Sequence, residues 1–152
     1  MRKVEILVIS IASPLLVGIY KEGICIQKIE KEGKSSDILP LLFEEILKEY
    51  SPEKLYYANG PGSYMAIKIA YVFLKTLAIS LDIPLQACDA FVFNNNSPIK
   101  AIGKNHFLKE NSAIIMKIIG DEVQKEPYKL PECLNSELFN ADCEPLYIVP
   151  AV

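Results

Sequence analysis

The strongest constraint on the fold comes from the apolar segments at the start of the chain. Residues 4–10 are mostly apolar and rich in β-branched side chains, and residues 15–20 are apolar. The Ser13-Pro14 turn separates them, so we expect two buried strands. A third strand with one solvated face is predicted at about 24–30, because apolar and polar residues partly alternate there. The short connections between these strands predict an antiparallel meander.

The next segment, from Ser35 to about Tyr50, predicts a helix with an unusually wide apolar stripe. Its apolar residues form two rows at i, i+4 spacing. One row contains Ile38, Leu42 and Ile46, and the other contains Leu39, Phe43, Leu47 and Tyr50. A helix that lies on a single sheet needs a narrower stripe. Either this helix is deeply buried, or the second row meets another helix, within the chain or in a partner.

A second helix is predicted at about 64–81, and it is apolar on nearly every side. Lys68 and Lys75 are seven residues apart and therefore lie on the same side. We expect this helix to be buried on several sides or to pack against another protein.

Short strands predicted at 55–58 and 85–88 complete the order βββαβαβ. This order is typical of the ribonuclease-H-like and actin-like folds, so we expect an α/β protein with a mixed sheet and helices. Residues 1–93 are assigned to an actin-like N-terminal lobe. A loop that begins at Asn94 marks the boundary. Residues 94–152 are assigned to a reduced second lobe with a C-terminal edge strand.

Enzymes with this core need a carboxylate at the end of the first strand, where it holds a metal ion or orients metal-bound water and phosphates. Here that place reads Ser10-Ile11-Ala12-Ser13, and Glu5 lies too early in the strand to replace the acid. The sequence therefore argues against independent phosphoryl transfer or nuclease activity. We assign no catalytic residue, metal site or cofactor to the chain. His106 is interpreted as a satisfied or surface histidine and Asp89 as a helix cap.

The turn Gly60-Pro61-Gly62-Ser63 is the most distinctive local motif. Glycine permits positive φ and close backbone approach, and the free N–H groups at a helix start can hold an anion. Gly60, Gly62 and Ser63 are therefore candidate contacts for an anion or a nucleotide. The alternative is a purely structural turn. The motif is not a P-loop, because the Gly-Lys-Ser/Thr ending is missing.

Charge and cysteine content exclude several classes of protein. The chain has 16 basic and 19 acidic residues, a net charge of −3, and Arg2 as its only arginine. Because guanidinium groups are the usual contacts to phosphates and bases, we do not expect the chain to bind nucleic acid by itself. The four cysteines form no C-x-x-C pair, which disfavours zinc, and reduced thiols are expected.

The apolar run near the N-terminus is not interpreted as a targeting signal. Pro14 divides it, no small-x-small cleavage site follows, and it is shorter than the roughly 20 residues of a membrane span. A cytoplasmic location without membrane contact is therefore expected.

Several spaced motifs together resemble a known family. The block Asn59-Gly60-Pro61-Gly62-Ser63-Tyr64, followed by residues 67–70, 75–78 and 83–85, is similar to the Gly-Pro-Gly-Ser-aromatic block of the TsaB (YeaZ) family. The start of the first helix resembles the family's His-Ser-Glu…Leu-Pro segment, and residues 145–150 resemble its closing Pro-x-Tyr-Leu-Arg-Pro. The chain departs from the family in lacking Asp-Thr-Ser after the first strand. Lys68 and Ala66 also replace a usual arginine and glycine.

The resemblance implies an actin-like, non-catalytic subunit in bacterial tRNA threonylcarbamoyladenosine modification. Such a subunit pairs through its first two helices with the homologous catalytic subunit TsaD, and the ATPase TsaE completes the assembly. ATP and metal are then expected on the partner subunit, and tRNA is reached only through the complex. The chain alone could form a homodimer through the same surface. The residues expected at the partner interface are Leu39, Leu42, Phe43, Ile46, Tyr64, Lys68 and Tyr71.

This interface and its rivals lead to different experimental expectations. If these residues stay uncovered until a partner docks, Phe43→Asp should abolish the complex and leave the monomer folded. One rival is a small actin-like phosphotransferase or hydrolase that binds nucleotide at the Gly60–Gly62 turn. Another is a scaffold for a different actin-like protein.

Overall fold

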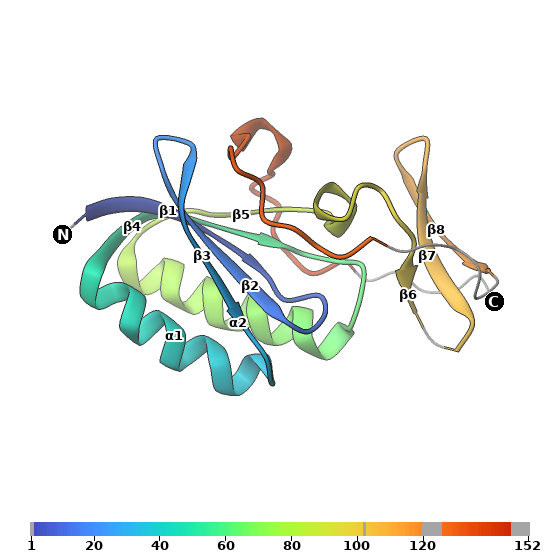
Figure 1. The fold of residues 1–152 in the computed structure, drawn as a ribbon, viewed down its shortest axis with the longest axis horizontal. Coiled ribbons are helices and arrows are strands. Elements are labelled where there is room, and N and C mark those ends of the chain that lie inside the picture. Colours follow the sequence, from blue (N-terminus) through green and yellow to red (C-terminus); the bar gives the residue numbers. More distant parts are fainter. Residues whose placement is uncertain (1, 102, 120–125, 147–152) are drawn as a thin grey trace.

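The computed structural model describes residues 2–101, 103–119 and 126–146. Its main sheet contains β1 (Arg2–Ile9), β2 (Leu15–Lys21), β3 (Ile24–Lys31), β4 (Tyr50–Ala58) and β5 (Leu85–Cys88), in the order β3-β2-β1-β4-β5. The first three strands pair antiparallel, whereas β4 and β5 run parallel to β1. The helices α1 (Ser35–Glu49) and α2 (Tyr64–Leu81) lie together on one face of this sheet (Figure 1). The predicted mixed α/β class and the order βββαβαβ are confirmed.

The central strand β1 is buried on both faces from Ile6 to Ile9. Ile6 pairs with Ile19 of β2 on one side and with Leu55 of β4 on the other, and all three side chains are fully buried. The two helices cover one face of the sheet, and C-terminal residues cover the other (Figure 1). This double burial explains why the first strand is a continuous apolar run instead of an alternating one.

Helix α1 uses its wide apolar stripe to contact both the sheet and α2. Leu39, Phe43 and Ile46 are its buried residues. The ring of Phe43 meets the ring of Phe73 in α2 edge to face, with 5.4 Å between the ring centroids. The second row of α1 therefore meets another helix of the same chain, which settles the alternative left open by the sequence.

Helix α2 connects β4 to β5, and these two strands are hydrogen-bonded neighbours in the sheet. Its buried residues, Ile67, Ala70, Leu74 and Ala78, lie on one side of the helix. By length and composition alone α2 could cross a membrane. Because its two ends lead into adjacent parallel strands, α2 is instead the crossover of a βαβ unit. Several of its other apolar side chains stay exposed, so α2 is not buried on several sides within the chain.

A separate three-stranded antiparallel sheet contains β6 (Ile99–Lys100), β7 (Asn105–Glu110) and β8 (Ala113–Ile118), and we refer to this sheet below as the second lobe. No strand was predicted at β7, because its polar residues obscure the alternation. The short turn η1 (Ala90–Phe93) leads toward this sheet from β5. Lys109 of β7 pairs with Asp89 at 2.6 Å, which ties the two sheets together. The predicted edge strand, at about 146–149, lies outside the described residues except for Leu146, which is not part of a strand.

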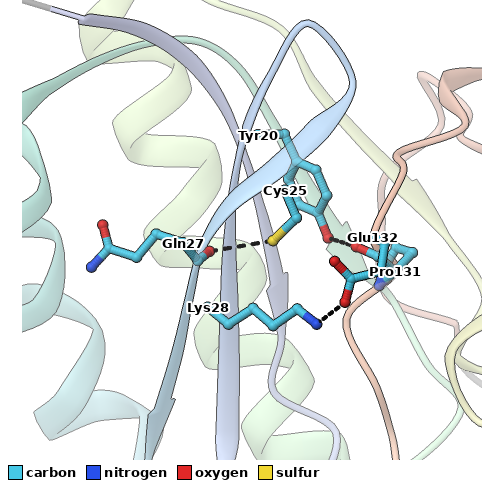
Figure 2. Close-up of polar contacts among 6 residues, drawn as sticks. All are labelled: Tyr20, Cys25, Gln27, Lys28, Pro131 and Glu132. Carbon is cyan, nitrogen blue, oxygen red and sulfur yellow. Dashed lines mark hydrogen bonds and ion pairs between the residues drawn. The ribbon is translucent and has the colours of Figure 1, made fainter.

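Residues 130–146, which we call the C-terminal strap, begin their path at the β3 edge of the main sheet. The backbone N–H of Cys25 donates to the carbonyl oxygen of Glu132 at 2.8 Å. The Tyr20 hydroxyl donates to the carbonyl oxygen of Pro131 at 2.7 Å, and Lys28 pairs with the Glu132 carboxylate (Figure 2). Burial raises the pKa of Tyr20, so its hydroxyl remains a donor across the ordinary pH range.

The strap then crosses the face opposite the helices and reaches the other edge of the sheet. The ring of Phe139 lies 4.5 Å from the ring of Tyr56, centroid to centroid. Asn140 forms an isolated antiparallel bridge with Ala87 of β5. The strap therefore covers this face of the sheet, as α1 and α2 cover the opposite face. Its only regular element among the described residues is the short turn η2 (Ser136–Leu138).

Candidate functional site

The carboxyl ends of β1 and β4 meet the turn that begins α2. Gly60 in this turn has φ 117°, a conformation that favours glycine. Gly62 lies directly against Ile11, the second residue after β1: a Cβ added to Gly62 would lie only 2.4 Å from Cγ2 of Ile11. Because Gly62 has no side chain, Ile11 can pack directly against it. The space over Gly62 is therefore filled by an apolar side chain of the same chain.

Replacement of Gly62 by Ala should destabilise the chain by about 1–3 kcal/mol, because the new methyl group would overlap Ile11. Urea denaturation followed by circular dichroism would measure the loss. Ile11→Ala in the same chain should recover part of it, since the Cγ2 atom is then absent. If the free energy of unfolding falls in the double variant by as much as in the two single variants combined, the contact with Ile11 does not explain the need for glycine at position 62.

The end of β1 carries no carboxylate. Ser10 and Ile11 follow the strand and are both buried. Glu5 lies further back, where its carboxylate accepts a hydrogen bond from the Tyr56 hydroxyl at 3.4 Å. Within residues 2–101, 103–119 and 126–146, no group of three or more His, Cys, Asp or Glu side chains could hold a metal ion. The described residues therefore do not assemble the acid cluster that phosphotransferases on this core use.

The remaining polar candidates are Asp89, His106 and Cys88. Asp89 Oδ1 accepts a hydrogen bond from the backbone N–H of Phe91 at 3.1 Å, so Asp89 caps η1 as predicted. His106 is buried; its Nδ1 lies 3.0 Å from the backbone carbonyl oxygen of Lys104, whereas its Nε2 has no hydrogen-bond partner among the described residues. Burial raises the pKa of the Cys88 thiol to about 12, which keeps it protonated and weakly nucleophilic at neutral pH.

Three residues of the predicted partner interface belong to the core of the chain. Leu39, Phe43 and Ile46 are buried by α2 and the sheet, and Phe43 is only 1% exposed. The expectation that these side chains stay uncovered until a partner docks is therefore wrong. Phe43→Asp would place a carboxylate in the core, so this substitution cannot test an interface. Whether the two helices pair with another subunit stays a prediction.

The other predicted interface residues are accessible to different degrees. Leu42 and Tyr71 are half-buried, whereas Tyr64 and Lys68 are exposed at the start of α2. The Lys68 Nζ lies 5.8 Å from the centre of the Tyr64 ring, within cation–π range. Tyr64 lines the space between the main sheet and the second lobe. Lys68 lines a groove between the two helices.

A row of exposed apolar side chains on α2 was missed by the sequence-based interpretation. Met65, Val72 and Ile79 are 62%, 54% and 70% exposed, and their seven-residue spacing places them on one side of α2. We call these three residues the α2 stripe. Beside it runs a groove of about 650 Å³ between α1 and α2, to which α1 contributes Ser36 and Pro40. The spacing is visible in the sequence, but the nearly uniform apolarity of α2 hides which side is covered.

The strand order, the two helices on one face and the crossover between β4 and β5 define an α/β protein of the actin-like, ribonuclease-H-like class. No family model matches the sequence, and no curated protein sequence does either. Among solved structures, the fold is similar to that of YeaZ from Pseudomonas aeruginosa, with a TM-score of 0.61 at 14% sequence identity over 84% of this chain and 68% of that chain.

A second solved structure has the same fold. It is described as an uncharacterized protein with similarity to peptidase YeaZ from Pseudomonas aeruginosa. Its TM-score is 0.55 at 14% identity, over 77% of this chain and 64% of that chain. At this identity the two matches establish a YeaZ-like fold. The chain spans about two thirds of the length of these proteins.

Proposed function

We propose that this chain is a non-catalytic accessory subunit that binds and activates a TsaD-like catalytic subunit in tRNA threonylcarbamoyladenosine modification. The observation that carries the proposal is the α2 stripe, which leaves large apolar side chains in water beside an open interhelical groove. The YeaZ-like fold and the motif resemblance around Gly60–Tyr64 support the choice of partner.

The chemistry of the stripe suggests what the partner surface must provide. Exposed apolar side chains grouped on one helix face mark interaction surfaces, because burial of each square ångström contributes about 25 cal/mol. Lys68 and Lys75 flank the stripe at i+3 positions from Met65 and Val72 and are both exposed. The partner surface that would complement the α2 stripe is therefore an apolar helical face with acidic residues at its rim, opposite Lys68 and Lys75.

The division of roles in the proposed complex is the one that the motif resemblance implies. This chain contributes the docking surface, and the partner subunit holds ATP and the metal. A TsaE-like ATPase joins the assembly, tRNA is contacted only through the complex, and the complex is cytoplasmic. In the absence of the partner, the same apolar stripe would also suit a homodimer of this chain.

Val72→Asp is the test of the proposed interface. We expect it to weaken binding to a purified TsaD-like subunit by about a hundredfold, because a carboxylate would have to be desolvated at the centre of an apolar contact. Isothermal titration calorimetry would measure the affinity, and a reconstituted tRNA modification assay should lose activity in parallel. Because Val72 is exposed, the free energy of unfolding should change by no more than about 0.5 kcal/mol.

Ile118→Asp is the matched control. Ile118 is an exposed aliphatic residue on β8, away from both helices. The Ile118→Asp substitution should leave both the affinity for the partner and the tRNA modification activity unchanged. If Val72→Asp binds the partner as tightly as the wild-type chain, the helical interface is wrong. If the isolated chain instead binds ATP with Mg²⁺ at micromolar concentration in the same calorimeter, the phosphotransferase alternative is favoured.

A further inference from the structure

A cavity lies between the two lobes, at the carboxyl end of the parallel strands of the main sheet. Its volume is about 920 Å³, and its walls come from the turn before α2 on one side and from β6, β7 and β8 on the other. Volumes of about 300–1,000 Å³ are typical of small-molecule sites, so the cavity is large enough for one such ligand. It lies apart from the α2 stripe and the interhelical groove, which are lined by different residues.

Both walls are largely apolar. Ile11 and Ile67 contribute side chains from the first lobe, and Ile99, Phe107 and Met116 contribute side chains from the second. Apolar surface facing water is stabilised when an apolar molecule covers it. The cavity therefore favours a ligand with an apolar body.

The electrostatics of the cavity do not suit a phosphate. Among the described residues that line it, only Lys100 and Glu126 are charged, and their charges have opposite signs. Phosphate binding needs several convergent donors or an excess of positive charge. At the turn before α2, Ile11 already fills the space over Gly62. The cavity therefore favours a neutral ligand over a nucleotide.

One polar group in the wall lacks a partner. Asn94 is only 3% exposed, and its Nδ2 donates to the carbonyl oxygen of Ser97 at 3.1 Å. Its Oδ1 has no hydrogen-bond partner among the described residues. A buried acceptor without a donor is costly, and most such groups in folded proteins are paired. Asn94 lines the cavity, so a ligand N–H or O–H can supply the missing donor once the Asn94 side chain turns its Oδ1 toward the cavity.

We propose that the interlobe cavity binds a neutral, mostly apolar small molecule that carries one N–H or O–H donor. Three independent features converge on this ligand class: the apolar walls, the balanced charge of Lys100 and Glu126, and the unpaired Oδ1 of Asn94. The cavity shares no residue with the α2 stripe, so either proposal can fail without the other.

A fluorescent probe with this chemistry tests the site directly. N-phenyl-1-naphthylamine is a neutral aromatic amine with one N–H, and its fluorescence rises in apolar surroundings. We expect saturable binding of one probe per chain at micromolar concentration. The N-methylated form of the same probe has no donor, so it should bind about fivefold or more weakly, as the loss of one buried hydrogen bond predicts.

A matched pair of tryptophan substitutions locates the probe. Ala12 is exposed and lines the cavity, so Ala12→Trp should fill its mouth and weaken binding about tenfold or more. Ala141 is also exposed but lies outside the cavity, so Ala141→Trp should bind the probe like the wild-type chain. Both variants should keep the circular dichroism spectrum of the folded chain, because both positions are accessible.

Three results would overturn the proposal. The first is equal probe binding by Ala12→Trp and the wild-type chain, which would place the probe elsewhere, such as at the α2 stripe. The second is equal affinity for the two forms of the probe, which would exclude a donor to Asn94. The third is displacement of the probe by ATP or inorganic pyrophosphate, which would show that the cavity takes a charged phosphate ligand.

Discussion

Phe43→Asp should unfold the chain. Phe43 is 1% exposed, and its ring packs against the ring of Phe73 at 5.4 Å between the two helices. Aspartate at this position loses the aromatic contact and leaves a carboxylate without water or a partner, at a cost of more than about 4 kcal/mol. Because domains of this size are stable by only about 5–15 kcal/mol, we expect most of the cooperative urea transition to be lost.

Leu41→Asp on the same helix is the control for Phe43→Asp. Leu41 is exposed, so the same charge at this position should change the free energy of unfolding by no more than about 0.5 kcal/mol. Urea denaturation of both variants, followed by circular dichroism at 222 nm as a measure of helix, gives the comparison. A Phe43→Asp chain as stable as the wild type would contradict the packing of α1 and restore Phe43 as an interface residue.

Phe139→Ala should release much of the C-terminal strap. Phe139 is a buried residue of the strap, with its ring centroid 4.5 Å from that of Tyr56 and 6.3 Å from that of Phe93. Its removal leaves a cavity over the face of the sheet opposite the helices, at an expected cost of roughly 3–5 kcal/mol. Limited proteolysis should then cleave the strap at protease concentrations that leave the wild-type strap intact.

The neighbouring residue provides the comparison for this prediction. Leu138 is half-exposed at the end of η2, so Leu138→Ala should cost well under half as much as Phe139→Ala. The two variants differ only in which of two adjacent apolar side chains is shortened. Equal losses of stability, measured by urea denaturation, would show that Phe139 does not hold the strap on the sheet.

Much of the main sheet could be predicted because its signals are local. The Ser13-Pro14 turn divides two apolar runs, and the Gly60–Ser63 turn precedes a long helical pattern, so the element order follows from neighbouring residues. The absence of an acid after β1 could also be predicted, since Ser10 and Ile11 stand where the carboxylate would be. Strand β7 was missed because Phe107 and Leu108 are adjacent apolar residues flanked by polar ones, so apolar and polar residues do not alternate.

The candidate interface could not be assigned residue by residue, for a different reason. The apolar rows of α1 and α2 predict that these helices make extensive contacts, but periodicity does not distinguish contacts within the chain from contacts with a partner. Phe43 and Val72 are both apolar residues on apolar helices. One is buried against Phe73, whereas the other is 54% exposed beside the groove. The packing of the two helices against each other and the sheet determines this difference.

The sequence by itself determined the βββαβαβ order, the mixed α/β class, the Gly-Pro-Gly turn and an apolar residue where an acid would follow the first strand. These properties depend on side chains that are close together along the chain. Only the tertiary structure decided that Leu39, Phe43 and Ile46 form core, that the α2 stripe stays in water, and that Asn94 lines a cavity between two sheets. It also placed Pro131 beside Tyr20 and Phe139 on Tyr56. Such contacts join residues far apart in sequence, where local periodicity carries no information.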